Sequence, residues 1–445
     1  MAPHGASRRD FLIGLAASIA PRSKSAQAAE ERAGPRKEAA HLAVDSASGT
    51  GAPPGPTFVH GGPNSMRYGE GSGYAVPERR RAVAQGNPWA PEDRVGAFSH
   101  LDEIYETRRI RCSAMPSTFS RSDIELPYVH ALRPTSLTDY LSRRPVTGLL
   151  IAKDDRILFE RYQYGRTGSD RLLGQSMTKS ITGLLVGLAV ADGALRSLDD
   201  VAGTYVPGLK GSEYGRTPVR ALLHMSSGVD FGEERDGGHD LTVLWRDMVL
   251  GSGLFGKKGT VKSIRQFDRR IAPPGTRYRY ASIEPDVLAV VLHAVLGRPL
   301  SDYLHEKLWL PLGTEADATW LVDAEGLEVG HFGFSAALRD YAHLGRLLAC
   351  DGAWGGTQLI PARWLYDATT VRSSEEYLAP GHSMKFGYGY LLWLLPGDRR
   401  QFALVGQNGQ RLCVDPKSRL VMVQTALEDI PEAWELWSNV CSQLA

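Results

Sequence analysis

The segment from Ser176 to Ala191 constrains the fold more than any other part of this 445-residue chain. Its apolar residues, among them Ile181, Leu184 and Leu188, point in nearly every direction around a helix instead of along one stripe. A helix of this kind is buried among other elements, because any face turned to water would expose apolar surface. Gly193 follows as a natural C-terminal stop. The sequence therefore predicts a buried, central helix.

Strand-like segments flank this helix in the sequence. A β-hairpin is predicted before it, over residues 146–164, with a turn at Asp154-Asp155. Further helices are expected after it, from Val219 to His224 and from Glu284 to Gly297. Late strands are predicted at residues 402–405, 411–414 and 420–425, and a closing helix at residues 431–444.

The order of these elements predicts the architecture. Strands from the two ends of the chain can join one antiparallel sheet, with the terminal helices on its face, while the middle of the chain forms a mostly helical lobe. The expected fold class is α/β, of the α+β kind: an antiparallel sheet flanked by helices plus a mostly helical lobe.

The first 28 residues predict an export signal. The pair Arg8-Arg9 precedes a short apolar run from Phe11 to Ala20, and Ala26-Gln27-Ala28 offers small residues for cleavage. This pattern is typical of twin-arginine export, so an exported, periplasmic or extracellular protein is expected. The apolar run is shorter than the roughly 20 residues that span a bilayer. The alternative is a disordered basic N-terminus.

Composition sets the domain boundaries and excludes some partners. Residues 29–88 are rich in Ala, Gly, Pro and charge, so a flexible segment is expected there, with the folded domain over residues 89–445 and order beginning near Trp89. A net charge of +1 gives no reason to expect nucleic acid or a membrane surface as partner.

Cysteine and histidine usage argues against a metal site. The four cysteines form no C-x-x-C pair, and the twelve histidines form no H-E-x-x-H motif. We expect no metal and no organic cofactor. Disulfides among the four cysteines remain possible after export.

A serine and a lysine stand one helical turn apart at the start of the predicted buried helix. Positions i and i+3 share a face, so the Ser176 hydroxyl and the Lys179 ammonium can touch. Serine needs a neighbouring base to become a nucleophile, and burial and a helix N-terminus both disfavour a charged lysine. S-x-x-K also arises by chance, and its place at the start of a buried helix is what favours a catalytic pair.

Two later segments can complete such a site. Tyr280, before the helix that begins near Glu284, can relay a proton to a leaving group. Gly406-Gln407, beside a strand, can aim backbone N–H groups at an oxyanion. Taken alone, Tyr280 is as readily a structural tyrosine, and residues 406–410 as readily a hairpin turn.

Other signals are weaker. Residues 174–178 nearly match the G-x-S-x-G of α/β-hydrolases, but the last glycine is missing and the preceding segment is polar. His224 lies in a predicted structural helix, which argues against a triad base. The acidic loop from Phe231 to Asp240 could select a cationic group or could be a solvated loop. Trp245 and Trp393 could line a pocket, but packing in the core is the favoured interpretation.

The motifs occur in an order that resembles the class C β-lactamase-like serine hydrolases, which include penicillin-binding peptidases, esterases and 6-aminohexanoate-dimer hydrolases. The resemblance runs from about residue 90 to the end and implies a β-lactamase/transpeptidase-like fold. Ser176, Lys179 and Tyr280 match the family's catalytic positions, and the N–H groups of Ser176 and Gln407 match its oxyanion hole. The segments that carry it are residues 174–180, 222–228, 274–282 and 406–416.

Two departures from the family pattern bear on the substrate. Ser282 stands where the family has an asparagine, and Leu404-Val405-Gly406 replaces Lys-Thr-Gly or His-Thr-Gly. The missing cation removes the group that would hold a β-lactam or peptide carboxylate. Both departures resemble the 6-aminohexanoate-dimer hydrolases, which implies hydrolysis of small amides or short carboxylic esters.

Two other functions remain open. A cell-envelope binding protein could keep the fold with little turnover. A β-lactamase or D,D-peptidase is the other alternative, and it would need a carboxylate-binding group for which the sequence shows no candidate. In every case the expected partner is a small molecule, with no nucleic acid and no stable membrane span.

Overall fold

The structure is a computed structural model that describes residues 55–79, 89–233, 239–251, 256, 258–382 and 384–445. The predicted export signal, residues 1–28, lies outside the described residues.

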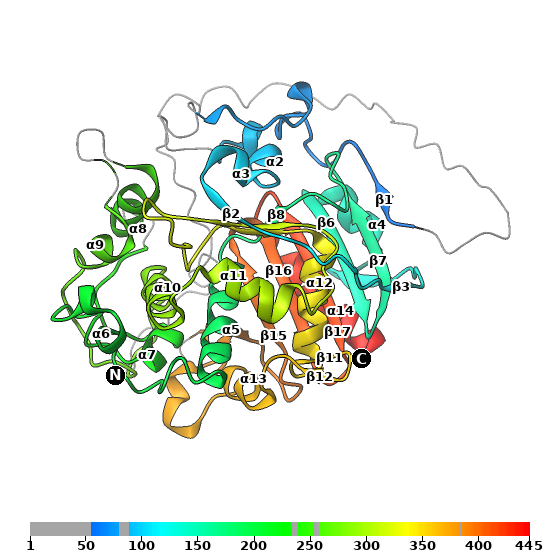
Figure 1. Ribbon diagram of the computed structural model, residues 1–445. Helices are drawn as coiled ribbons and strands as arrows, with labels where there is room; N and C mark the ends of the chain where they lie inside the picture. The colour runs from blue at the N-terminus through cyan, green and yellow to red at the C-terminus, as the bar shows by residue number, and fades with distance from the viewer. Residues whose placement is uncertain (1–54, 80–88, 234–238, 252–255, 257, 383) are drawn as a thin grey trace, which may run out of the picture.

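A nine-stranded sheet, counted over the described residues, forms the centre of the molecule (Figure 1). Its order is β1-β7-β6-β17-β16-β15-β14-β13, and β3 also pairs with β7. Only β1 and β3 pair in parallel with their neighbour, so the sheet is mixed at this edge and antiparallel elsewhere. The strands are β1 (Thr57–Phe58), β3 (Ser120–Arg121), β6 (Val146–Lys153), β7 (Arg156–Tyr162), β13 (Gly387–Tyr388), β14 (Trp393–Leu394), β15 (Phe402–Gly406), β16 (Gln410–Asp415) and β17 (Leu420–Ala426).

The two ends of the chain meet inside this sheet, as the sequence predicts. Strand β6 of the N-terminal hairpin pairs antiparallel with β17 near the C-terminus, with Leu150 opposite Val423. The hairpin of β6 and β7 and the three late strands are therefore confirmed.

A second sheet of four described strands lies beside the first, in the order β2-β9-β10-β8. It comprises β2 (Thr107–Ile110), β8 (Leu172–Leu173), β9 (Ala318–Leu321) and β10 (Phe334–Ala336). Two short ribbons pair β4 (Tyr128–His130) with β5 (Arg133–Thr135) and β11 (Ala353–Trp354) with β12 (Thr357–Gln358).

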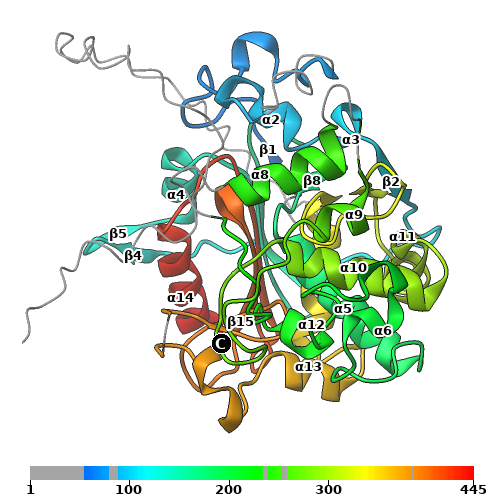
Figure 2. The same ribbon diagram turned by 90° about the vertical axis from the view of Figure 1, so that its left-hand side faces the viewer.

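Helices cover both faces of the large sheet, as Figure 2 shows. On one face lie α4 (Leu137–Arg143) and α14 (Glu432–Leu444); on the other lie α5 (Met177–Ala191) and α12 (Leu338–Ala349). The helical lobe extends outward from α5. It contains α6 (Ala202–Tyr205), α7 (Val219–Leu223), α8 (His239–Trp245), α9 (Thr260–Ile264), α10 (Ile283–Leu296) and α11 (Leu300–Leu304).

Shorter helical elements complete the chain. They are α2 (Arg94–Ala97), α3 (Leu101–Ile104) and α13 (Ala362–Ala368), with single turns at η1 (Glu70–Ser72), η2 (Pro91–Asp93), η3 (Pro207–Leu209), η4 (Arg246–Leu250), η6 (His305–Trp309), η7 (Ser373–Leu378) and η8 (Gln407–Gly409).

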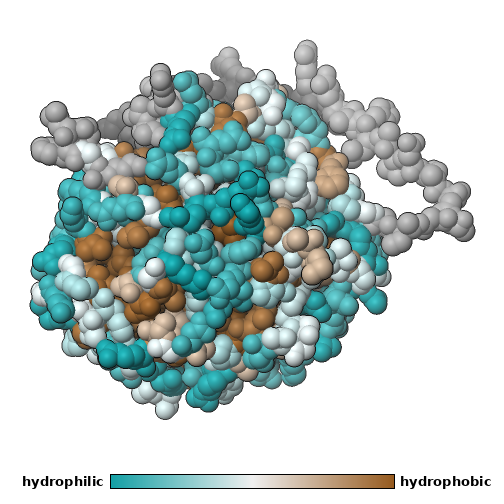
Figure 3. All heavy atoms as spheres, viewed as in Figure 1, coloured by the Kyte–Doolittle hydropathy of each residue, from teal (hydrophilic) through white to brown (hydrophobic). Residues whose placement is uncertain are grey.

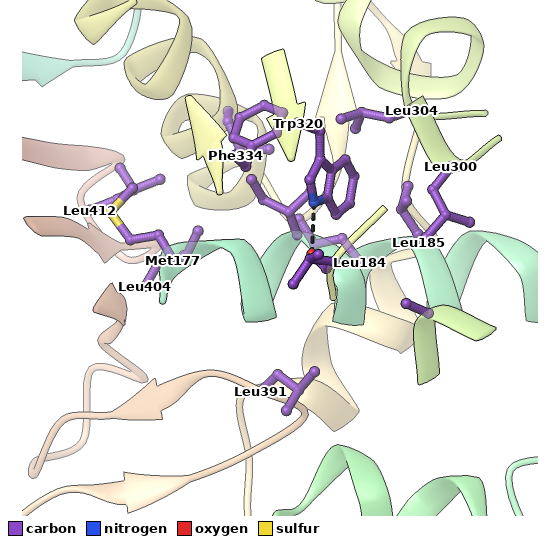
Figure 4. Packing of buried hydrophobic residues seen from close by; sticks show 14 of the residues in the cluster. Met177, Leu184, Leu185, Leu300, Leu304, Trp320, Phe334, Leu391, Leu404 and Leu412 are labelled. Atoms are coloured by element: carbon purple, nitrogen blue, oxygen red, sulfur yellow. Dashed lines mark hydrogen bonds between the residues drawn. The ribbon is translucent and has the colours of Figure 1, made fainter. Parts of the chain in front are cut away.

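The central helix α5 is buried on all sides, as its sequence predicts. Figure 4 shows side chains of α5 between those of the large sheet, the small sheet and the lobe; labelled residues are Met177, Leu184, Leu185, Leu300, Leu304, Trp320, Phe334, Leu391, Leu404 and Leu412. All of these side chains are at most 1% exposed. Each fully buried leucine contributes about 2 kcal/mol of hydrophobic stabilisation, so this helix is fixed strongly in place.

The described part of the N-terminal segment is packed against the domain, which corrects the expected start of order near Trp89. Strand β1 adds to the sheet edge, and Tyr68 and Tyr74 are buried. The Tyr68 hydroxyl donates to the carboxylate of Glu428. Aromatic anchors outweigh the Gly- and Pro-rich composition here, because each large buried ring removes much apolar surface from water.

The structure also bears on membrane association and on the surface. Within the described residues no single helix has the length and apolar character needed to cross a bilayer; a pair bent by 77°, Ile283–Leu296 with Leu300–Trp309, meets the criterion by length and composition only. On the face drawn in Figure 3, hydrophilic side chains predominate, with hydrophobic patches over the helical lobe.

Candidate active site

The predicted serine–lysine pair forms at the start of α5. Ser176 is the N-cap residue of this helix, and the Lys179 Nζ donates to the Ser176 Oγ at 2.9 Å. Lys179 is only 2% exposed, whereas Ser176 is half-buried. The nucleophile candidate therefore reaches the surface while its base candidate stays inside the fold.

The residues before Ser176 explain how the hydroxyl is held there. Strand β8 ends at Leu173, and the N–H of Gly174 donates to Phe334 O at 2.9 Å. Gly174 has no room for a side chain, because a Cβ would stand 2.7 Å from the Tyr341 hydroxyl. Gln175 then adopts a positive φ of 52°, a strained conformation that is common at functional sites.

Strand β8 also corrects one sequence argument. The segment before the near G-x-S-x-G match was expected to be polar, but Leu172 and Leu173 form a short buried strand. This strand pairs antiparallel with β10 in the small sheet. The architecture is nevertheless that of two antiparallel-based sheets and a helical lobe, which excludes an α/β-hydrolase fold with its mainly parallel sheet.

Lys179 has an unusual set of neighbours for a buried lysine. Its Nζ donates to the backbone O of His331 at 3.3 Å as well as to Ser176, and it lies 5.0 Å from the centre of the Tyr280 ring. No carboxylate among the described residues forms an ion pair with it. The amine is therefore held by a hydroxyl, a carbonyl and an aromatic face, none of which carries a full negative charge.

Tyr280 lies within the same cluster. Its ring stacks on Trp393 at 5.9 Å and meets the edge of Tyr388 at 6.4 Å. Among the hydrogen bonds of the described residues, none joins the Tyr280 hydroxyl to Ser176 or Lys179. The predicted proton relay is thus assembled by ring contacts but not closed by a hydrogen bond, and hydrogen bonds of this kind can tighten when a substrate is bound.

Gly406 brings the third motif against the residues before the nucleophile. A Cβ at this position would stand 2.3 Å from the Gly174 O and 2.8 Å from the Gln175 Cβ. Only glycine allows this approach of β15 to the start of α5. Leu404, where the family pattern has a cation, is fully buried on the same strand.

The predicted oxyanion hole consists of the N–H groups of Ser176 and Gln407. Neither N–H donates a hydrogen bond to any acceptor among the described residues. Gln410 holds the turn that contains Gln407: its Nε2 lies 3.1 Å from Gln407 O and 2.7 Å from Ala426 O, and its Oε1 accepts from the Ala426 N–H. Sequence reasoning assigned no role to Gln410, since a polar residue at a strand start carries no such signal.

Among the hydrogen bonds of the described residues, none joins Ser282 to Ser176 or Lys179. Ser282 is buried as the N-cap residue of α10, and its N–H donates to the carboxylate of Glu233. Glu233 belongs to the acidic loop that the sequence singled out; residues 234–238 of that loop lie outside the described residues. The structure therefore brings one carboxylate of this loop next to the Tyr280–Ser282 segment.

A second carboxylate lies deeper behind this segment. Glu284 is 1% exposed and accepts from the Ser227 hydroxyl at 2.6 Å, while its Oε2 has no partner among the described residues. Burial raises the pKa of Glu284 to about 8. Sequence reasoning missed this residue, because a glutamate near a helix start is usually read as exposed.

Two other residues that the sequence analysis weighed, His224 and Trp245, pack against aromatic side chains. His224 is buried against Tyr390 at a ring distance of 4.9 Å, and burial lowers the pKa of His224 to about 3. Trp245 packs on Phe332 and Tyr105. The contacts of His224 agree with a structural histidine, whereas Trp245 is partly buried at the edge of the core.

The last candidates for chemistry are metal-binding clusters and cysteine thiols. Over the described ranges, no group of three or more His, Cys, Asp or Glu side chains is placed to hold a metal ion. The thiols of Cys112, Cys350, Cys413 and Cys441 are free in the structure.

Comparison with known proteins identifies the family. The family model described as "Beta-lactamase" matches residues 137–427. This range includes all four motif segments and ends just after β17. The chain belongs to the beta-lactamase family, and the members of this family that it matches include hydrolases and esterases.

Individual relatives narrow the comparison. The chain is 27% identical over 365 residues to a 6-aminohexanoate-dimer hydrolase of Paenarthrobacter ureafaciens, a match that covers 78% of this chain and 90% of the relative. The protein is thus a β-lactamase-family hydrolase related to 6-aminohexanoate-dimer hydrolase.

Solved structures confirm the β-lactamase/transpeptidase-like fold. A structure named "Putative 6-aminohexanoate-dimer hydrolase from Bacillus anthracis" has a TM-score of 0.70 at 22% identity, covering 80% of this chain and 95% of that one. A family VIII carboxylesterase has a TM-score of 0.52 at 16% identity, covering 67% and 93%.

Proposed function

We propose that the protein is an exported serine hydrolase that cleaves small amides or short carboxylic esters through an acyl-serine intermediate. The observation that carries this proposal is the 2.9 Å contact between the buried Lys179 Nζ and the half-exposed Ser176 Oγ. The two unpaired N–H groups at Ser176 and Gln407 support it, because acyl transfer needs donors aimed at the developing oxyanion.

The reaction begins with attack by Ser176. The Lys179 amine takes the hydroxyl proton as the Ser176 Oγ bonds to the substrate carbonyl carbon, and the carbonyl oxygen becomes an oxyanion. The N–H groups of Ser176 and Gln407 hold this oxyanion. Collapse of the intermediate breaks the bond to the leaving amine or alcohol, which takes a proton from the Tyr280 hydroxyl; the Lys179 ammonium returns a proton to Tyr280.

Water completes the cycle. It loses a proton to the Lys179 amine as its oxygen attacks the acyl carbon. The bond from that carbon to Ser176 Oγ then breaks, the Oγ takes the proton back from the Lys179 ammonium, and the carboxylic acid is released. The stacking of Tyr280 on Trp393 keeps the phenol ring beside Lys179 throughout. None of these steps calls for a metal or an organic cofactor.

The substrate class follows from the relatives and from Leu404. The protein of Paenarthrobacter ureafaciens is named for a small amide, and a solved neighbour is a carboxylesterase. A fully buried leucine in place of a cation cannot bind a substrate carboxylate, which argues against β-lactams and peptide C-termini.

Turnover by the mature protein tests the proposal. Hydrolysis of p-nitrophenyl acetate and of the 6-aminohexanoate linear dimer is measured for the wild type, Ser176→Ala and Lys179→Ala. Activity on either substrate that vanishes in both variants supports the mechanism, and the ratio of ester to amide turnover selects the substrate class. Equal rates in all three proteins would contradict it.

A binding protein with little turnover is the second candidate. The observation in its favour is that no hydrogen bond joins the Tyr280 hydroxyl to Ser176 or Lys179 among the described residues. A fluorophosphonate probe separates the two functions, because it reacts only with an activated serine. Failure of the wild type to react would favour the binding protein.

We also propose that residues 1–28 direct twin-arginine export. The sequence Arg8-Arg9, the apolar run to Ala20 and Ala26-Gln27-Ala28 support this. Replacement of both arginines by lysine is expected to retain the precursor in the cytoplasm, as cell fractionation would detect. Undiminished export of that variant would contradict the assignment.

A further inference from the structure

We infer that Asp286 is a positioning residue for the reaction proposed above: it fixes the backbone carbonyl that holds Lys179 beside Ser176. This inference rests on the proposed function, because it assigns Asp286 a role in placing the base of that reaction. Asp286 touches neither Ser176 nor Lys179 in the hydrogen bonds of the described residues, so its effect is transmitted through the backbone at His331.

The starting point is the way Lys179 is held. The His331 O is the second hydrogen-bond acceptor of the Lys179 Nζ, at 3.3 Å, beside the Ser176 Oγ at 2.9 Å. A lysine side chain is long and has many rotamers, so two fixed acceptors are needed to define where its amine lies. With no ion pair to Lys179 in the described part of the chain, the position of the His331 carbonyl decides that geometry.

Asp286 fixes the segment that supplies this carbonyl. It is fully buried in the first turn of α10. Its Oδ1 accepts from the N–H of Gly330 at 2.9 Å and from the N–H of His331 at 3.2 Å, and the His331 Nδ1 lies 2.8 Å from its Oδ2. Three donors from two adjacent residues thus converge on one carboxylate.

The other side of the segment is fixed by the nucleophile helix. The Thr182 Oγ1, three residues after Lys179 on α5, donates to Gly330 O at 2.8 Å. Gly330 also lies directly against α10, because a Cβ there would stand 2.1 Å from Pro285 O. The backbone at residues 330–331 therefore lies between α5 and α10, and the hydrogen bonds to Asp286 fix it on the α10 side.

A small shift of this carbonyl is expected to matter. Displacement of a catalytic group by about 1 Å can lower a rate by roughly 100-fold. The loss is expected in acylation and not in substrate binding, because the His331 carbonyl contacts the base and, among the described residues, Asp286 forms hydrogen bonds only with residues 330 and 331. Asp286 is therefore expected to affect kcat much more than KM.

The imidazole of His331, which contacts Asp286, is an alternative candidate for the functional group. A carboxylate that orients a histidine is also the arrangement of a catalytic dyad. The two roles separate cleanly, because His331→Ala removes the imidazole but keeps the backbone carbonyl and the N–H that donates to Asp286. Asp286→Asn keeps an oxygen that can accept from both backbone N–H groups.

The experiment compares wild type, Asp286→Ala, Asp286→Asn, His331→Ala and Lys179→Ala in p-nitrophenyl acetate turnover and in the rate of fluorophosphonate labelling of Ser176. Thermal unfolding checks that each variant is folded. We expect Asp286→Ala to lower kcat and the labelling rate by about 100-fold with KM changed less than about threefold. Asp286→Asn should recover most of that loss, and His331→Ala should lose no more than about threefold.

Several results would overturn the inference. One is a folded Asp286→Ala protein with wild-type labelling; another is a His331→Ala protein as slow as Asp286→Ala, which would make the imidazole the active group. If Asp286→Ala does not fold, the comparison rests on the other two variants. A larger loss of kcat in His331→Ala than in Asp286→Asn overturns the inference. A larger loss of kcat in Asp286→Asn, with KM unchanged, supports it. A wild type that neither labels nor turns over ester, or a Lys179→Ala protein as fast as wild type, would instead refute the proposed function.

Discussion

The first turns of helices α14 and α5 each bury a charged side chain, and they treat it in opposite ways. Glu432 on α14 accepts from Tyr128 at 2.7 Å, from Arg143 at 2.7 Å and 3.0 Å, and from Arg144 at 2.6 Å. Lys179 on α5 contacts a hydroxyl, a carbonyl and a ring face. Glu432 holds two parts of the fold together through its ion pairs, whereas the Lys179 amine forms no ion pair among the described residues and remains available for chemistry.

The same contrast divides two buried glutamates. Burial alone would raise the pKa of Glu432, but hydrogen bonds from Arg143, Tyr128 and Arg144 outweigh it and lower the pKa to about 2. Glu284 forms no ion pair among the described residues, and burial raises its pKa to about 8. Glu284 therefore keeps its proton at neutral pH, whereas Glu432 is ionised.

The largest predicted effect comes from substitutions at Ser176 and Lys179. Ser176→Ala and Lys179→Ala should each lower kcat/KM for p-nitrophenyl acetate by at least about 10³-fold, because serine and base act as one unit. Thermal unfolding should change little in Ser176→Ala. A residual rate above a tenth of wild type in either variant would contradict the assignment.

A smaller effect is expected from Gly406→Ala. The new Cβ must push β15 away from Gly174 and Gln175, which displaces the Gln407 N–H from the nucleophile. Loss of one oxyanion donor lowers kcat by roughly 10²-fold. Gly168→Ala is the matched control, since a Cβ there meets only the Tyr162 hydroxyl at 3.8 Å and should leave kcat unchanged.

In the region around α14, Glu432→Ala should lower the stability of the fold and leave catalysis unchanged. It leaves Arg143 and Arg144 without their buried partner, and because both side chains are more than a third exposed, the expected cost is about 2 kcal/mol. Urea unfolding measures this cost. A kcat/KM that falls in parallel with stability would show that the two regions are not independent.

The smallest predicted effect is a pH dependence of stability. The folded-state pKa of Glu284, about 8, lies above the ordinary value of 4.5, so the unfolded chain loses this proton first as the pH rises. The stabilising effect of the protonated form is complete below about pH 4.5 and is lost by about pH 8. Between pH 6.5 and 8 the free energy of unfolding should therefore fall by about 1–2 kcal/mol.

The control for this effect is Glu284→Gln, which should flatten the curve in that window. Below pH 6.5 other groups interfere: burial lowers the pKa values of His224 and His343 to about 3, which makes stability rise with pH between about 3 and 6.5. Burial also raises the pKa of Asp340 to about 7, which adds a slope of the same sign as Glu284. An unchanged slope in Glu284→Gln between pH 7 and 8 would refute the account of this residue.

Much of the fold could be predicted from sequence because its central elements have strong local signals. The all-round apolar pattern of α5 and the runs of β6 and β17 are properties of a few adjacent residues. The packing of Tyr68 on the domain could not be predicted, because it depends on Glu428, which is 360 residues away. Composition describes the average of a segment, whereas two or three aromatic anchors decide where it lies.

The candidate site also contains contacts that could be predicted from the sequence and contacts that could not. Ser176 and Lys179 share a helix turn, so their contact follows from spacing alone. The contact of Lys179 with His331, 152 residues later, and the bonds from Asp286 to residues 330–331 depend on how α5, α10 and the small sheet meet. The missing hydrogen bond at the Tyr280 hydroxyl is likewise a matter of ring packing against Trp393, for which the sequence carries no pattern.

Mapping of the covalent adduct tests the central claim most directly. The mature protein is treated with a fluorophosphonate probe, digested and analysed by mass spectrometry, beside Lys179→Ala. The account predicts a single adduct on Ser176, formed at least about 10³-fold more slowly when Lys179 is absent. An adduct on another residue, or equal labelling of Ser176 in both proteins, would contradict a serine nucleophile activated by this lysine.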